Sequence, residues 1–413
     1  MTGSNSSESM KPRLLVVTST FPRWKEDTDP PFVYELSRRL TSDFDVVVHT
    51  PHYHGSLQRE TMEGMQIHRF RYFLSRFEKL AGGQGIVPKL RRNRLYYLLL
   101  PLFLIAQCFS LLLLVYEKKP NVIHAHWLIP QGFLAVLMKW IFGVPVIVTA
   151  HGADVFSLRG GIFIWLKRLI VNNADRIVTV SNSLAKTLIE DTRSSIQPEV
   201  IPMGVDASLF SPHHRNNSIR QKYGISGPFL LFVGRLTEKK GVQYLIDAME
   251  LVKNESPDSK LLIVGHGELE QKLRKQVDDL GLQEVVLFAG GVVNKELPAY
   301  YASADIFIGP SIQTADGDSE GFGLTFVEAA MSGCLLIGTR IGGIEDIIRD
   351  GQTGFLVPSR DVSALAKQIQ YTIYNLDNLV DMRIKGREET VKKLDWKYIS
   401  MSYKKLLQEV YEG

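Results

Sequence analysis

The stretch that decides the fold and the chemistry of this chain is residues 317–329, GDSEGFGLTFVEA. Two carboxylates, Glu320 and Glu328, flank a glycine-rich loop that opens into a helical pattern. Glycines allow backbone N–H groups to approach a ligand closely, and the first turn of a helix attracts anions. A carboxylate placed just before such a helix favours a ligand with hydroxyls at one end and a diphosphate in the middle. A nucleotide sugar has this chemistry.

On both sides of this stretch, short apolar runs alternate with helical patterns. In the first half, strands are predicted at 13–18, 45–49, 66–70, 121–125, 145–149 and 176–180, and helices at 31–41, 94–116, 130–142, 161–173 and 183–191. In the second half, strands are predicted at 228–233, 260–264, 285–289, 305–309, 334–338 and 354–357, and helices at 240–253, 268–280, 296–303, 323–333, 343–350 and 361–376. This alternation predicts an α/β protein with two Rossmann-like, doubly wound domains facing across a cleft.

The break between the two domains is predicted near PMGVD, residues 202–206. Residues 11–205 then form an N-terminal domain and residues 206–395 a C-terminal domain. The amphipathic segment 396–413 is expected to be a helix that packs back on the first domain. The Ser-rich residues 1–10 lack the basic and apolar regions of a signal peptide, so we expect a disordered tail.

Composition indicates an ordinary globular chain of 413 residues, with 45% hydrophobic and 22% charged residues. The net charge of +4 is uneven: residues 1–205 carry 24 Lys and Arg against 16 Asp and Glu, which gives +8. The two cysteines, Cys108 and Cys334, lie in apolar runs and are expected to be buried thiols in a reducing compartment.

One segment has the length and composition of a membrane span. Residues 95–116, LYYLLLPLFLIAQCFSLLLLVY, contain no charged side chain and are long enough to cross a bilayer. A spanning helix would put the strands before and after it on opposite sides of a membrane, although they belong to one predicted sheet. We therefore expect a helix that is buried or lies against a membrane. The basic segment 59–94 before it is expected to contact anionic lipid headgroups.

Cations follow the predicted strand 228–233, where ligands bind in open α/β sheets. The guanidinium of Arg235 can fork onto a phosphate, and Lys240 adds a compact point charge. Further along, Gly265 opens a tight strand-to-helix turn. Glu270 stands at the third glycine position of G-x-G-x-x-G, so the turn fits a nucleotide site better than an NAD oxidoreductase.

His151 follows the strand 145–149 and is expected to face the cleft. His124 and His126 lie on one face of the strand 121–125. A metal site made by these three imidazoles is conceivable, but the segment offers no carboxylate partner and a metal is not favoured.

Asp316 and Asp318 form the Asp-x-Asp pair nearest to the loop, and such pairs can hold a divalent ion on a diphosphate. A metal is not needed here, because Arg235 and Lys240 already offer positive charge. The two glutamates could also be a glycosidase pair. Glu328 lies about a turn and a half into the helix, however, so they reach opposite ends of an extended ligand more easily than one glycosidic bond.

Together these residues resemble the GT-B glycosyltransferases of family 4. The likeness covers nearly the whole chain and is carried by VIHAHW (122–127), VTAHGAD (148–154), FVGRLTEKKG (232–241) and EGFGLTFVEA (320–329), among others. The resemblance implies retaining transfer of a hexose from a UDP- or GDP-linked sugar, with no metal and no other cofactor.

The resemblance also implies roles for the loop. Glu320 would bind the hydroxyls of the donor sugar, and Glu328 would bind those of the ribose. Backbone amides would hold the sugar and the distal phosphate; they belong to Phe322, Gly323 and Leu324.

Outside the loop, Arg235 and Lys240 would neutralise the diphosphate as it leaves. His151 would reach the donor sugar once the cleft closes. Gly265 would lie beside the nucleotide, and the backbone near Val293 would select the base.

Two departures from the family pattern concern the acceptor side and the loop after 341. The family's Gly-Gly pair after the first strand, in a loop that usually helps to form the acceptor site, is replaced by TSTFPRW, residues 18–24. Arg23 in this loop and Asp154 are the residues that we assign to the acceptor side. In the element Gly-Gly-x-Pro-Glu, Asp346 stands near the place of the glutamate.

We therefore expect a glycosyltransferase that acts on a lipid-linked or cell-surface glycan acceptor. Its expected location is cytoplasmic, on the inner face of the cell membrane, with an anionic membrane surface and not nucleic acid as its partner. Two rival interpretations stay open: a GT-B nucleotide-sugar epimerase, and a non-catalytic protein that binds nucleotide sugars.

Overall fold

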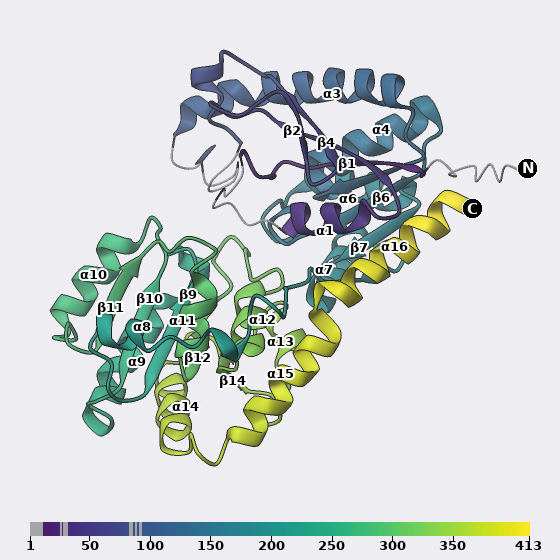
Figure 1. The fold of residues 1–413 in the computed structure, drawn as a ribbon. Coiled ribbons are helices and arrows are strands. Elements are labelled where there is room, and N and C mark those ends of the chain that lie inside the picture. Colours follow the sequence, from purple (N-terminus) through teal and green to yellow (C-terminus); the bar gives the residue numbers. More distant parts are fainter. Residues whose placement is uncertain (1–10, 25–26, 28–31, 82–85, 87–88, 91–92) are drawn as a thin grey trace, which may run out of the picture.

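The computed structural model describes residues 11–24, 27, 32–81, 86, 89–90 and 93–413. The predicted tail, residues 1–10, lies outside these ranges. Two β-sheets, each covered by helices, form two domains, and the C-terminal helix α16 runs along the first of them (Figure 1).

The first sheet has the strand order β3-β4-β2-β1-β5-β6-β7-β8. Its strands are β1 (Arg13–Val17), β2 (Asp45–Pro51), β3 (Arg59–Met62), β4 (Met65–Phe70), β5 (Val122–His126), β6 (Val146–Ala150), β7 (Arg176–Thr179) and β8 (Glu199–Val200). All pairings are parallel except that of β3 with β4. The central strands are buried on both faces, which is why β-branched and apolar residues follow one another without alternation.

The second sheet is parallel, with the order β11-β10-β9-β12-β13-β14. Its strands are β9 (Phe229–Val233), β10 (Lys260–Val264), β11 (Val286–Gly290), β12 (Ile306–Gly309), β13 (Leu335–Thr339) and β14 (Phe355–Val357).

The helices of the first domain are α1 (Phe32–Leu40), α3 (Leu99–Lys118), α4 (Phe133–Phe142), α5 (Ala153–Phe156), α6 (Gly161–Asn173) and α7 (Asn182–Thr192). Those of the second domain are α8 (Asn217–Lys222), α9 (Val242–Glu255), α10 (Glu270–Asp279), α11 (Leu297–Ser303), α12 (Leu324–Met331), α13 (Ile344–Ile347), α14 (Val362–Tyr374) and α15 (Val380–Leu394). Single turns lie at η1 (Ser75–Phe77), η2 (Arg94–Leu98), η3 (Leu128–Gly132), η4 (Pro212–His214) and η5 (Glu238–Lys240).

The chain crosses between the domains twice, side by side. Backbone hydrogen bonds join the two crossings at Val205, whose O accepts from Trp396 N at 3.1 Å and whose N donates to Leu394 O at 2.9 Å. After the second crossing, α16 (Trp396–Glu412) runs back along the first domain (Figure 1), where Tyr403 Oη donates to Ile201 O at 3.1 Å.

The structure differs from the sequence-based prediction in a few places. Helix α15 was not predicted, because its 15 residues carry few apolar side chains and bury few of them. The predicted helix 343–350 is only the single turn α13. Cys334 is buried as expected, but Cys108 is only half-buried, since it lies at the side of α3; both are free thiols.

Candidate functional site

Glycines in two loops shape the approach to α12. Gly323 has φ +103° and ends the loop where the helix begins. A Cβ on Gly342 would lie 2.1 Å from Glu320 O, so Gly342 and Gly343 let a second loop run against the first. This packing fixes the position of Glu320 just before the amino end of α12.

Glu320 is held as an anion by a cluster of cations. Lys240 Nζ donates to Glu320 Oε2 at 2.5 Å, and both side chains are largely buried. Lys239 lies beside them, 3.4 Å from Asp318 Oδ1. Burial opposes ionisation, but the charges of Lys240, Lys239 and Arg235 outweigh it and lower the pKa of Glu320 to about 2. Such a carboxylate accepts hydrogen bonds from hydroxyls and does not act as a general acid.

Glu328 has the opposite electrostatic environment. It lies inside α12, where burial raises its pKa to about 7 although Tyr301 and Lys240 act to lower it. Tyr301, at the end of α11, donates from its Oη to Glu328 Oε2 at 2.7 Å. The two glutamates that the sequence pairs are therefore chemically different: one is firmly ionised, and the other changes charge near neutral pH.

His151 lies directly after β6 and packs among aromatic rings. Its ring is 4.8 Å from that of Trp127 and 5.0 Å from that of Phe32, centroid to centroid. Its Nε2 is 3.0 Å from His126 Nδ1. Burial lowers the pKa of His151 to about 3, so the imidazole is neutral.

The contact with His126 selects one tautomer of His151. His126 Nε2 is buried without a hydrogen-bond partner among the described residues. A buried N–H without an acceptor is costlier than an unused lone pair, so the proton of His126 belongs on Nδ1, which donates to His151 Nε2. His151 then carries its own proton on Nδ1 and can donate it to a ligand.

Asp154 has a structural role that the sequence did not suggest. It is buried, with Oδ1 accepting from the backbone N–H groups of His151 and Gly152 at 3.1 and 2.9 Å. Oδ2 accepts from Leu128 N at 2.9 Å. These contacts join the turn after β6 to the segment after β5 and position His151, while the acceptor-side role expected of Asp154 stays a prediction.

The two domains touch at this point. Ser181 Oγ donates to Gly321 O at 2.7 Å, and a Cβ on Gly321 would lie 2.3 Å from His151 O. Asp346 accepts from the backbone and side chain of Asn182 at 2.7 and 3.0 Å. The structure thus brings His151 to the loop of Glu320, with the cleft closed there.

Arg235 is exposed at the end of β9, close enough to act on the charge of Glu320. Gly265, with φ +136°, follows the neighbouring strand β10. A Cβ there would lie 1.9 Å from Gly234 O, so the turn requires glycine. These turns bring the ends of β9 and β10 together beside the glutamate loop.

The loop after β11, in which Val293 is exposed, is held by His266. His266 Nε2 accepts from Gly291 N at 2.7 Å, and its Nδ1 lies 2.9 Å from Glu270 Oε2. Glu270 also binds Arg274, so it orients the histidine that supports this loop. Glu270, which stands in place of the third glycine of G-x-G-x-x-G, therefore has a structural role: it orients His266.

Arg23 lies in a different environment from the donor-side cations. It forms an ion pair with Asp27 at 2.5 Å and stacks over Trp24 and Tyr53. These contacts hold the loop at the carboxyl end of β1, and the acceptor-side role of Arg23 stays a prediction.

The residues weighed as metal ligands are engaged with other partners. His124 Nε2 is 2.8 Å from Thr149 Oγ1, and Asp318 accepts from Ser319 N at 2.9 Å. Thr314 donates to Asp316. Within the described ranges, no three His, Cys, Asp or Glu side chains are grouped so that they could hold a metal ion.

Sequence reasoning missed several of these partners. Tyr301, Ser181 and Asn182 were not singled out, and His126 was weighed only as a metal ligand. Their roles arise from contacts between distant segments, which spacing along the chain does not show.

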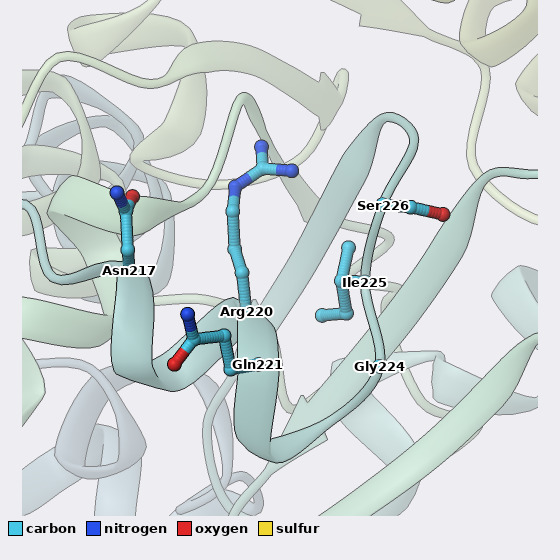
Figure 2. A pocket seen from close by; sticks show the side chains of 6 residues that line it. All are labelled: Asn217, Arg220, Gln221, Gly224, Ile225 and Ser226. Atoms are coloured by element: carbon cyan, nitrogen blue, oxygen red, sulfur yellow. The ribbon is translucent and has the colours of Figure 1, made fainter.

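A surface hollow lies away from this site, beside α8 (Figure 2). Arg220 points along it, but its guanidinium is used by Ser303 O, Gly227 O and Asp305. It is a structural cation, and the hollow has no catalytic group.

Two family models match the chain. The model described as "Glycosyl transferases group 1" matches residues 215–389, and "Glycosyltransferase Family 4" matches residues 31–209. The GDP-mannose-dependent alpha-(1-6)-phosphatidylinositol monomannoside mannosyltransferase of Mycolicibacterium smegmatis is 30% identical over 271 residues, which are 65% of this chain and 71% of that protein. The D-inositol 3-phosphate glycosyltransferase of Pseudarthrobacter chlorophenolicus is 32% identical over 278 residues, 63% of this chain and 64% of that protein.

Solved structures share the fold. Sucrose-phosphate synthase from Thermosynechococcus elongatus aligns with a TM-score of 0.77 and 21% identity, covering 97% of this chain and 100% of that one. HepE from Anabaena in complex with UDP-glucose aligns with a TM-score of 0.72 and 18% identity, covering 96% and 99%. These alignments confirm the predicted pair of Rossmann-like domains, the GT-B fold.

Proposed function

Since the chain belongs to the group 1 glycosyl transferases of family 4, we propose that it moves a hexose from a nucleoside-diphosphate sugar to a lipid-linked or cell-surface glycan acceptor. The proposal includes retention of the anomeric configuration and independence from a metal ion. It rests on one observation above all: Glu320, paired with Lys240 at 2.5 Å, lies in the loop that His151 meets across the cleft.

The residues divide the donor between them in this proposal. Glu320, ionised at neutral pH because its pKa is lowered to about 2, accepts from sugar hydroxyls. Lys240 and Arg235 face the diphosphate, helped by the amino end of α12. Glu328, further into α12, accepts from the ribose, and the Nδ1–H of His151 donates to the sugar from the other domain.

The reaction then needs no protein nucleophile. The bond between C1 and the diphosphate oxygen breaks, and the diphosphate leaves with the electron pair. The acceptor hydroxyl forms the new bond to C1 on the same face, and its proton passes to the departing phosphate oxygen. Attack on that face retains the configuration, while the cations stabilise the charge that develops on the diphosphate.

The names of related proteins guide the choice of substrates. The mycobacterial relative uses GDP-mannose and a phosphatidylinositol mannoside, and HepE was solved with UDP-glucose. We propose a donor of one of these two classes and an acceptor that carries a lipid. The free thiols of Cys108 and Cys334 agree with work on the cytoplasmic side of the cell membrane.

A donor screen followed by a transfer assay tests this function. A nucleotide sugar at 100 times its Kd should stabilise the protein by about 2.7 kcal/mol, which a thermal shift detects. Transfer of labelled sugar to a lipid extract should be abolished in Glu320→Ala and Lys240→Ala. It should persist in Lys275→Ala, a matched change at an exposed ion pair of the same domain.

Three results would overturn the proposal. They are full transfer by both site variants, donor binding without transfer to any lipid or glycan extract, and epimerisation of the donor sugar in the absence of an acceptor.

A further inference from the structure

The outer face of α3 is an apolar stripe without a protein partner in the described part of the chain. Its side chains recur every three or four residues from η2 to the end of α3 and are 42–72% exposed: Leu95, Leu98, Leu102, Ile105, Phe109, Leu113 and Tyr116. Such spacing places them on one side of the helix. The 20 residues of α3 make this stripe about 30 Å long.

The inner face of the same helix belongs to the core of the first domain. Phe103, Gln107, Leu111, Leu114 and Val115 are buried. A helix that is apolar on every face is normally buried on every face, by protein or by lipid. Here the sheet covers one side only, and a patch of this size marks an interaction site.

Crossing the bilayer is not an option for this helix, although its length and hydropathy would allow it. The strands on either side of it, β4 and β5, belong to the same sheet, joined through β2 and β1. Figure 1 shows α3 lying along the edge of the first domain that is farthest from the second domain. The helix can therefore only lie flat against whatever covers it.

Neighbouring elements extend the apolar face. Trp140 and Ile141 are exposed at the end of α4, which packs beside α3. Phe73, Leu74 and Phe77 are exposed around η1, whose surroundings pack on the first half of α3. Exposed aromatic and aliphatic side chains on neighbouring elements are typical of proteins that rest at a membrane–water boundary.

Cations border this face and point to the charge of the partner. Arg94 and Lys119 are exposed at the two ends of the stripe, and Arg76 and Lys79 are exposed beside it. Among the described residues none of these four forms an ion pair. A second copy of the chain packed on the stripe would bring these cations together, whereas anionic lipid headgroups would neutralise them.

We propose that α3 lies flat in the surface of an anionic phospholipid bilayer, with its apolar stripe inserted between the headgroups. This inference deepens the proposed function, since it names the surface from which a lipid-linked acceptor is taken. This orientation would also bring a lipid-linked acceptor close to the site. The amino ends of α3 and α6 lie at the same edge of the sheet as His151, which follows β6. Ile162 and Trp165 are exposed there on α6.

Vesicle sedimentation with the full-length protein tests the inference. The protein should bind phosphatidylcholine vesicles that contain phosphatidylglycerol, and bind pure phosphatidylcholine vesicles more weakly. The double variant Phe109→Gln/Leu113→Gln should lower binding at least about tenfold. The matched variant Leu251→Gln/Tyr374→Gln, at exposed apolar positions of the second domain, should stay within about twofold of the wild type.

Further variants separate charge from insertion. Arg94→Ala/Lys119→Ala should reduce the preference for anionic over neutral vesicles and leave the weak binding to neutral ones. Failure of the wild type to bind, or equal binding by Phe109→Gln/Leu113→Gln, would overturn the inference. So would a dimer, seen by light scattering, that this double variant dissociates.

The vesicle assay needs no sugar donor, so its outcome is independent of catalysis. A protein that transfers sugar to a glycan acceptor but binds no vesicle contradicts this inference and the lipid on the acceptor, but leaves the sugar transfer itself standing. A protein that binds vesicles through α3 but transfers no sugar contradicts only the proposed function.

Discussion

Binding of the nucleotide sugar should weaken about tenfold when the pH falls from about 8 to about 6, because of Glu328. Burial raises the pKa of this carboxyl to about 7, against the hydrogen bond from Tyr301 and the charge of Lys240. Ribose hydroxyls that donate to Glu328 bind its ionised form. The free protein must therefore lose a proton before it binds, and that loss becomes harder as the pH falls.

The magnitude follows from the pKa. One unit below it, about nine in ten Glu328 side chains are protonated, and one unit above it, about one in ten. The apparent affinity therefore changes about tenfold across this range, or about 1.4 kcal/mol. The buried histidine His151 does not contribute, because its pKa of about 3 keeps it neutral throughout.

Calorimetric titration with an intact nucleotide sugar measures this effect, since its diphosphate carries no proton in the range. At about pH 7, binding should release about half a proton, visible as a dependence of the heat on the buffer. Glu328→Gln should bind with an affinity that does not change with pH. A flat profile in the wild type, or the same slope in Glu328→Gln, would refute the assignment of Glu328 to the ribose.

Three further outcomes are expected. Gly321→Ala puts a methyl group 2.3 Å from His151 O, which should push the two domains apart. Donor binding should persist while kcat falls at least about tenfold, and small-angle scattering should show an opened cleft. An unchanged kcat would contradict this expectation. His126→Leu removes the partner that selects the His151 tautomer, so kcat should fall about tenfold at unchanged donor affinity. His126→Asn should restore part of the loss; if it does not, the role of His126 is packing and not selection of the tautomer. Lys240→Met removes the hydrogen-bonded partner of the buried Glu320, so urea unfolding at neutral pH should show a free energy of unfolding lower by about 3 kcal/mol. This loss should shrink as the pH falls from about 4.5 towards 2, and the double variant that adds Glu320→Gln should recover stability. Additive losses in the two single variants would exclude the pairing.

Much of the fold could be predicted from the sequence because parallel strands leave a strong local signal. After their first residue, runs such as RLLVV (13–17) and KLLIV (260–264) are apolar at every position, since both faces are covered. The elements that the sequence did not predict lack this apolar signal. Strand β3 is an exposed edge strand, and α15 is a polar helix that packs on α12 before the chain crosses back to the first domain.

The site could be predicted in outline only. Glu320, Lys240 and His151 carry their chemistry in the motif itself. The sequence could not show that Asp154 turns its carboxylate onto the backbone, because that requires Leu128 N to lie beside it in space. It also could not separate the two glutamates, whose difference in pKa depends on which of them the lysines reach.

The most direct test of the central claim is a crystal structure of the protein with a bound nucleoside diphosphate. The account predicts that the carboxylate of Glu328 lies within hydrogen-bonding distance of the ribose hydroxyls. It also predicts that Arg235 and Lys240 contact the phosphates at the amino end of α12. A nucleotide bound elsewhere, or bound here with its ribose turned away from Glu328, would contradict the division of roles between the two glutamates.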